Sequence, residues 1–170
     1  MSSKSKPADN IVLIGMPAVG KSTAGVLLAK RLSKSFIDTD VSLQRQHGMS
    51  LRDFMDRHGV DAFRRAETDC VLSIACEQTV IATGGSVVYS EASMQHLRSL
   101  GKIVFLNVEV GELEARIGGL DRRGVVRATD QSLRELHAER LPLYRRYADV
   151  TVECTGKTHE SVVEQIVGSL

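Results

Sequence analysis

Residues 15–22 (GMPAVGKS) combine residue types and spacing that point to one kind of chemistry. They match the pattern G-x-x-x-x-G-K-[ST], a loop whose backbone N–H groups surround the phosphates of a nucleotide. Gly15 and Gly20 permit a close approach of the backbone that a Cβ atom would block. The Lys21 ammonium can reach the β- and γ-phosphates, and the Ser22 hydroxyl can ligate magnesium. The segment therefore predicts a binding site for a nucleoside triphosphate.

The segments on either side of this loop support the prediction. Residues 11–14 (IVLI) are all apolar, which is typical of a strand buried on both faces of a parallel sheet. After the loop, apolar residues recur at helical spacing, at Ala24, Leu27, Leu28 and Leu32. A strand, a loop and a helix N-terminus in this order bring unpaired N–H groups and the positive end of a helix dipole to one point. A glycine-rich turn that matches by chance is disfavoured, because both flanks are correct.

Two further pairs of candidate residues follow predicted strands. Asp38 and Asp40 come directly after the apolar pair Phe36-Ile37. Another pair, Gly84-Gly85, follows the apolar run 79–82. Open parallel sheets bind ligands at the carboxyl ends of their strands, so both pairs are expected near the phosphate-binding loop. The alternatives are a helix cap with a solvated acid for the first pair, and a tight turn for the second.

The rest of the chain alternates between helical and strand patterns. Helices are expected over residues 41–46, 51–58, 61–77, 90–100, 112–117 and 158–167, and strands over 102–108 and 150–152. Ser132 and Glu135 form a capping box that opens another helix, which Pro142 is expected to interrupt. We therefore predict an α/β fold with three αβα layers, in which a five-stranded parallel sheet has helices on both faces.

The remaining segments set the expected domain organisation. Residues 1–10 are polar and are expected to form a flexible N-terminal tail. Residues 11–170 are then expected to form one domain around the phosphate-binding loop. Within it, residues 119–131 show no periodicity and contain arginines and glycine, which suits a mobile lid that closes over phosphates.

Composition limits the class of protein. The 170 residues are 42% hydrophobic and 25% charged, with a net charge of +1. These proportions indicate a globular protein, and the balanced charge gives no reason to expect a nucleic-acid or membrane partner. Cys70, Cys76 and Cys154 lack metal-type spacing, and no signal sequence precedes them, so reduced thiols in a cytoplasmic protein are expected. The small size favours a monomer.

Taken together, the motifs make the chain similar to the shikimate kinases, small relatives of the nucleoside monophosphate kinases. They span nearly the whole chain, at residues 15–23, 38–40, 63–64 with Glu67, 83–85, Arg116 and 140–144. The resemblance implies a kinase that depends on ATP and Mg2+ and acts on a small-molecule substrate. It would transfer the γ-phosphoryl group to a hydroxyl of shikimate, giving shikimate 3-phosphate.

The resemblance also implies the residues of the nucleotide site. ATP would be bound by Gly15, Ala18, Val19, Gly20, Lys21, Ser22, Thr23 and, against the adenine, Arg116. Asp38 would reach magnesium together with Ser22. One arginine of the lid, either Arg122 or Arg123, would reach the transferred phosphoryl group.

For the acceptor site, the resemblance implies five residues. Asp40 would hold the acceptor hydroxyl and act as its base or positioning group. Arg64 and Arg140 would clamp the carboxylate, since guanidinium groups match a planar carboxylate with two parallel hydrogen bonds. The backbone at Gly84 and Gly85 would contact the ring hydroxyls.

Three departures from the family pattern leave alternatives open. Ser86 replaces a third glycine, residues 122–126 replace an Arg-Pro-Leu-Leu run, and residues 153–157 lack a proline. A related enzyme that acts on another small hydroxy compound fits these departures as well. A nucleotide-binding module without turnover is a third possibility, against which Asp40 argues, since a pure binding module needs no acid beside an acceptor pocket. Arg64 and Arg140 could also form ordinary surface ion pairs. The five histidines show no metal spacing and are expected on the surface or in loops.

Overall fold

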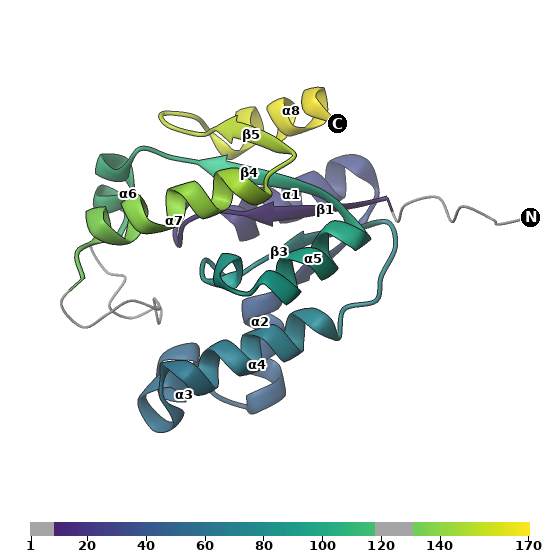
Figure 1. Ribbon diagram of the computed structural model, residues 1–170. Helices are drawn as coiled ribbons and strands as arrows, with labels where there is room; N and C mark the ends of the chain where they lie inside the picture. The colour runs from purple at the N-terminus through teal and green to yellow at the C-terminus, as the bar shows by residue number, and fades with distance from the viewer. Residues whose placement is uncertain (1–8, 118–130) are drawn as a thin grey trace, which may run out of the picture.

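Five parallel strands form the centre of the protein, which the computed structural model describes over residues 9–117 and 131–170 (Figure 1). In spatial order they are β2 (Ser35–Asp38), β3 (Thr79–Ala82), β1 (Asn10–Ile14), β4 (Gly101–Asn107) and β5 (Val150–Glu153). Each pair of neighbours is parallel. The α/β class and the five-stranded parallel sheet expected from the sequence are confirmed.

The strand order reverses around β1, in the middle of the sheet. From β1 the chain runs to the outer strand β2, returns to β3 beside β1, and then crosses to β4 on the other side. Ligands of open α/β sheets bind at such a reversal, beyond the carboxyl ends of the strands. The loop that follows β1, residues 15–20, therefore starts at the position where this fold places a ligand.

Helices cover both faces of the sheet. They are α1 (Lys21–Leu32), α2 (Thr39–His47), α3 (Leu51–His58), α4 (Val60–Leu72), α5 (Glu91–Leu100), α6 (Val110–Ile117), α7 (Leu133–Tyr147) and α8 (His159–Ser169), with a 3-10 helix η1 (Val87–Tyr89). In Figure 1, α5 and α7 lie in front of the sheet, and α1 lies behind it and packs against α8. Because the sheet is covered on both faces, every residue of β1 and β3 is buried.

Helices α2, α3 and α4 gather below the sheet in Figure 1 and have a small apolar core of their own. Its buried members are Leu43, Leu51, Phe54, Phe63 and Cys70. The Ser50 side chain caps α3 by accepting from the Asp53 N–H, as the capping pattern predicted. We call these three helices the lobe, and it forms one wall of the cavity described below.

The expected interruption at Pro142 is wrong, because α7 runs unbroken through this residue. The capping box of Ser132 forms as expected at the start of the helix. Arg140 and Tyr144, which lie on either side of the proline, are both fully buried. A proline removes one backbone donor and crowds the preceding turn. At this position the tertiary packing of the buried face of α7 outweighs that local cost.

Two boundaries also differ from the expectation. The helix expected over residues 61–77 ends at Leu72, and the chain then turns, with Gln78 at a φ of 52° just before β3. Strand β1 begins at Asn10, inside the expected N-terminal tail. Its neighbour Asp9 accepts a hydrogen bond of 2.8 Å from Lys34, so the structured chain includes this residue as well.

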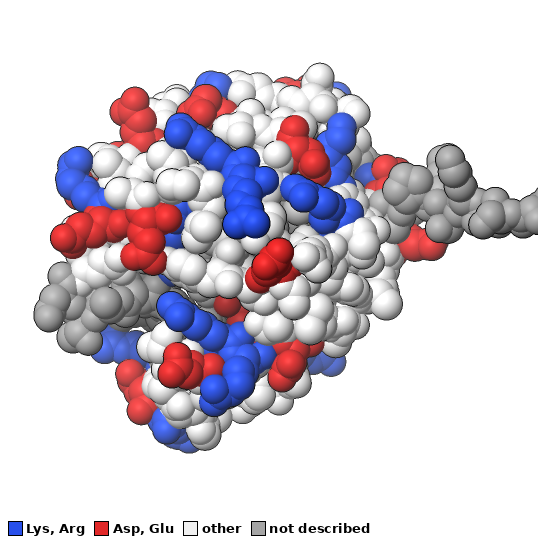
Figure 2. Space-filling model, in the orientation of Figure 1, with Lys and Arg blue, Asp and Glu red and all other residues white. Residues whose placement is uncertain are grey.

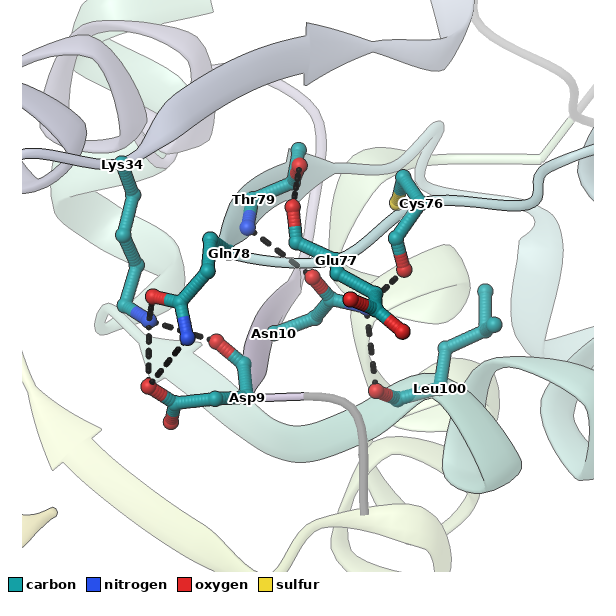
Figure 3. Close-up of polar contacts among 8 residues, drawn as sticks. All are labelled: Asp9, Asn10, Lys34, Cys76, Glu77, Gln78, Thr79 and Leu100. Carbon is teal, nitrogen blue, oxygen red and sulfur yellow. Dashed lines mark hydrogen bonds and ion pairs between the residues drawn. The ribbon is translucent and has the colours of Figure 1, made fainter. Parts of the chain in front are cut away.

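Asn10 joins three segments at the amino ends of the strands (Figure 3). Its amide nitrogen donates to the carbonyl oxygens of Cys76 and Leu100, at 2.7 and 3.1 Å. Its side-chain oxygen accepts from the Thr79 N–H at 2.9 Å. The residue is only 2% exposed, so these backbone groups have little access to water as a substitute. This edge is opposite the cavity, and the network is therefore structural.

We expect Asn10→Ala to lower the free energy of unfolding by about 3 kcal/mol, because it leaves buried backbone groups without partners. Urea unfolding followed by circular dichroism measures the change. Gln95→Ala is the matched control, since it removes an exposed hydrogen bond to Glu91 and should cost less than about 0.5 kcal/mol. Equal effects of the two substitutions would contradict the role of Asn10.

Basic and acidic side chains are intermixed on the face of the molecule shown in Figure 2. Exposed ion pairs among the described residues include Arg31 with Glu164 at 3.2 Å and Arg134 with Glu114 at 2.7 Å. Exposed pairs of this kind contribute little to stability. Within residues 9–117 and 131–170, no helix combines the length and the apolar character needed to cross a membrane.

Candidate active site

A cavity of about 770 Å³ opens at the carboxyl ends of the strands. Its walls come from the loop after β1, the lobe with the start of α2, the loop after β3, and helices α6 and α7. The lining includes many of the residues singled out from the sequence: Ala18, Gly20, Lys21, Ser22, Thr23, Asp38, Asp40, Gly84, Gly85, Arg116 and Arg140. Segments that are far apart in the sequence therefore meet around one space.

The loop between β1 and α1 has a backbone shape that exposes N–H groups. Gly20 precedes α1 with a φ of 99°, and Ala18 has a φ of 63°. Gly15 has a φ of 150°, and a Cβ atom there would lie 2.6 Å from the Leu106 carbonyl oxygen. Val19 is buried. Because Gly20 has no side chain to cap α1, the first N–H groups of the helix are available to an anion.

Lys21 is held inside the loop that it follows. Its ammonium group donates to the carbonyl oxygens of Gly15 and Met16, at 2.8 Å each, and the residue is 8% exposed. Burial lowers the pKa of Lys21 to about 8, while attraction to Asp40 opposes this change. The lysine is thus fixed at the cavity, with a third ammonium hydrogen left for an anion.

Asp38 does two things at the start of α2. Its Oδ1 accepts from the N–H groups of Asp40 and Val41, so the helix-cap alternative is correct. Its Oδ2 accepts from the Ser22 hydroxyl at 2.5 Å, which brings an acid and a hydroxyl together beside the loop. Two oxygen ligands suit Mg2+, which keeps several waters and also takes phosphate oxygens. The described residues contain no cluster of three or more metal-binding side chains, so phosphates would complete such a site.

Asp40 lies in the first turn of α2 and faces the cavity. Burial raises the pKa of its carboxyl group from 3.8 to about 6, and attraction to Lys21 opposes the change. Repulsion from Asp38 adds to the increase. The carboxylate is therefore a stronger base than an exposed aspartate and is still mostly ionised at neutral pH.

Glu67 from α4 is a second acid in the same cavity, to which the sequence analysis gave no separate role. It is 5% exposed, and burial raises its pKa to about 7, opposed by a hydrogen bond from Ser86. The Ser86 hydroxyl donates to Oε2 at 2.6 Å. Among the described residues, Oε1 has no hydrogen-bond partner. Ser86, the residue that departs from the family pattern, therefore orients an acid of the site.

Gly84 and Gly85 do more than form a turn, because the absence of a Cβ atom leaves room for neighbouring side chains. A Cβ atom at Gly84 would lie 2.4 Å from Glu67 Oε1 and 2.8 Å from Asp40 Oδ1. At Gly85 it would lie 2.8 Å from Pro17 and 3.0 Å from Arg140 Nη1. The glycine pair therefore lets two carboxylates and one guanidinium group approach the same backbone.

The two candidate carboxylate-binding arginines differ in burial. Arg140 lines the cavity and is 1% exposed, so it is no surface ion pair. Arg64 is exposed and is not among the lining residues. Its guanidinium carbon lies 5.0 Å from the centre of the Tyr89 ring, and that of Arg140 lies 5.2 Å from the same centre. The structure thus joins the two arginines through a tyrosine that the sequence analysis did not single out.

Arg116 from α6 contacts the loop on its nucleotide side. Its Nη1 donates to the carbonyl oxygens of Ala18 and Val19, at 3.4 and 3.2 Å. His159, at the start of α8, also lines the cavity, and its Nε2 would lie 2.8 Å from a Cβ at Gly20. His159 is exposed, as expected for the histidines, but its place at the cavity was not predicted. No spacing in the sequence linked it to the loop.

The expected lid, residues 119–131, lies almost entirely outside the described residues. Arg122 and Arg123, the two candidates for the lid arginine, are outside them as well. Gln131 is described and donates to Glu139 of α7 at 2.7 Å. The assignments of Arg122 and Arg123 thus stay predictions.

Comparison with known proteins bears on what this site does. The family model described as shikimate kinase matches residues 17–170. A shikimate kinase of Francisella philomiragia is 37% identical over 161 residues, which cover 92% of each chain.

Solved structures of shikimate kinases are also similar to this chain. A shikimate kinase from Acinetobacter baumannii, solved in complex with shikimate, superimposes with a TM-score of 0.87 at 28% identity, covering 95% of this chain and 92% of that one. A shikimate kinase from Aquifex aeolicus superimposes with a TM-score of 0.82 at 31% identity, covering 94% and 95%. Both superpositions cover nearly the whole of this chain.

Proposed function

Because the chain belongs to the shikimate kinase family, we propose that it transfers the γ-phosphoryl group of ATP to a hydroxyl of shikimate, giving shikimate 3-phosphate and ADP. One observation carries the proposal. The cavity that contains the phosphate-binding loop with Lys21 also contains Asp40, suited to a hydroxyl, and Arg140, suited to a carboxylate. An acceptor with both groups can therefore place its hydroxyl beside the bound nucleotide.

The nucleotide side of the cavity binds ATP through positive charge and N–H groups. The N–H groups at the start of α1 and the ammonium group of Lys21 hold the phosphates. Arg116, which is hydrogen-bonded to the loop, lies against the adenine. Ser22 and Asp38 would hold Mg2+, which supplies charge neutralisation at the phosphate oxygens when it is bound.

The acceptor side orients the hydroxyl and removes its proton. Asp40 accepts a hydrogen bond from the acceptor O–H and takes the proton as the oxygen bonds to the γ-phosphorus. The bond from that phosphorus to the oxygen of ADP breaks in the same step, and ADP keeps the electron pair. Because Asp40 is mostly ionised at neutral pH, it is ready to accept the proton.

The carboxylate of the acceptor is recognised by arginine. Arg140 binds it from the cavity wall on α7, and Arg64, exposed on α4 beyond the lining residues, would reach it from beside Tyr89. The backbone of Gly84 and Gly85 would contact the ring hydroxyls. Arg140 is buried at the cavity and suits a carboxylate, because its planar guanidinium group can donate two parallel hydrogen bonds to one.

An assay of ADP release tests the function. We expect turnover with ATP, Mg2+ and shikimate, and at least about 100-fold lower kcat/KM with the carboxamide of shikimate as the acceptor. A panel of other small hydroxy compounds tests the alternative acceptor. If well-folded protein releases ADP at the same rate with and without shikimate, the acceptor is wrong.

We also propose that residues 11–170 act as one kinase domain and as a monomer in the cytoplasm, without nucleic-acid or membrane partners. The balanced charge, and a cavity whose walls are all positioned by one sheet, support this organisation.

A further inference from the structure

Tyr89 occupies the end of η1, the short helix that follows the Gly84-Gly85-Ser86 segment. It is half-buried and does not line the cavity. Its ring nevertheless lies beneath the two arginines that come from opposite walls, α4 and α7, at 5.0 and 5.2 Å from the guanidinium carbons. These distances are within the range of cation–π contacts.

The hydroxyl of Tyr89 fixes the ring relative to α7. It donates to Oε1 of Glu139 and accepts from Nε of Arg140 at 3.2 Å. The hydrogen bond from Tyr89 holds the pKa of Glu139 below its ordinary value, so this carboxylate stays charged. With its Nε bonded to the hydroxyl, Arg140 has its Nη1 beside Gly85, at the cavity.

Two guanidinium groups that lie against one ring repel each other, which disfavours their staying together there. The negative face of an aromatic ring attracts both cations, and the charged Glu139 behind the hydroxyl adds to this attraction. An aliphatic side chain of similar size provides neither effect. The tyrosine thus supplies an attraction that offsets the repulsion between the two arginines and holds them in place before the acceptor binds.

We propose that Tyr89 is a positioning residue that holds Arg64 and Arg140 in place for the carboxylate of the acceptor, and so determines selectivity for acidic acceptors. The inference rests on the proposed function, in which these two arginines bind that carboxylate. Tyr89 acts through them and does not touch the acceptor.

Steady-state kinetics of Tyr89→Leu and Tyr89→Phe test the inference. We expect Tyr89→Leu to raise the KM for shikimate about 10-fold, with kcat and the KM for ATP changed less than about 2-fold. Tyr89→Phe keeps the ring and should stay within about 3-fold of the wild type in KM for shikimate. With the carboxamide of shikimate, Tyr89→Leu and the wild type should have equal kcat/KM, because the arginines have no carboxylate to bind.

A general structural role predicts a different pattern, in which both acceptors and ATP are affected alike. Tyr147→Leu is the matched control, since it removes a tyrosine that also has an arginine, Arg146, over its ring at 5.4 Å but lies at the end of α7 and does not line the cavity. It should leave the KM for shikimate unchanged. Tyr89→Met provides a second non-aromatic variant, so that the result does not depend on the folding of one protein.

The outcomes separate the two proposals. If the wild type turns over shikimate but Tyr89→Leu and Tyr89→Met leave its KM within 2-fold, only the role of Tyr89 is overturned. An equal loss with the carboxamide also overturns it. If the wild type does not use shikimate at all, the proposed function fails, and the inference fails with it.

Discussion

We expect Lys21→Ala to lower kcat by about 1,000-fold without preventing the protein from folding. The phosphoryl group in transit spreads negative charge over its oxygens, and a cation fixed in a cavity with little water stabilises that charge strongly. Lys21 is fixed in this way, because two carbonyl oxygens of the loop hold its ammonium group. ADP release in the presence of shikimate measures the loss, and thermal unfolding verifies the fold.

The matched control for this substitution is Lys30→Ala, which removes an exposed lysine from the last turn of the same helix. It should leave kcat within about 2-fold of the wild type, since it acts on neither the loop nor the cavity. Lys21→Met keeps most of the aliphatic side chain and should be as inactive as Lys21→Ala. Activity retained in Lys21→Met would mean that the packing of the stem matters and the charge does not.

The nucleotide half of the site was predictable because its signal is local. Residues 11–14 are apolar without a break since β1 is covered on both faces, and the glycines and lysine of the loop follow at fixed spacing. Asp38 and the segment 83–85 were found for a related reason, since they lie at the carboxyl ends of β2 and β3. A site residue of this kind can be predicted from a few consecutive residues, namely an apolar strand and the polar or glycine residues at its end.

The acceptor half depends on contacts that sequence spacing does not show. Glu67, Ser86 and Tyr89 come from α4 and from the segment after β3, and they meet only because the lobe packs beside the sheet. His159 reaches the loop through the packing of α8 on α1. Pro142 was misjudged for the same reason, since a local rule about helices was outweighed by the burial of the helix face that contains Arg140.

The second large effect is expected at Asp40. Asp40→Asn keeps the size and the helix position of the side chain but removes the base, and we expect kcat to fall by about 100-fold to 10,000-fold. The affinity for ATP should stay within about 3-fold, because Asp40 faces the acceptor and Lys21 still holds the phosphates. ADP release gives kcat, and isothermal titration calorimetry with a non-hydrolysable ATP analogue gives the affinity. Equal loss of binding and turnover would contradict the assigned role.

The pH dependence distinguishes Asp40 from its neighbour. Because burial raises the pKa of Asp40 to about 6, the proton-accepting form is lost as the pH falls through that value. The kcat/KM for shikimate should then decrease about tenfold for each pH unit below about 6. The residual activity of Asp40→Asn should lack this dependence, since asparagine does not titrate there.

Glu67 is the acid that could imitate this behaviour, because its pKa of about 7 lies close by and both carboxylates approach Gly84. Two acids in such proximity titrate as a pair, so the wild-type profile alone does not assign the base. Glu67→Gln removes the second acid and keeps an acceptor oxygen for the Ser86 hydroxyl. If Asp40 is the base, Glu67→Gln retains a decrease in kcat/KM near pH 6. If Glu67 is the base, that decrease disappears in Glu67→Gln and remains in Asp40→Asn, which would reverse the two roles.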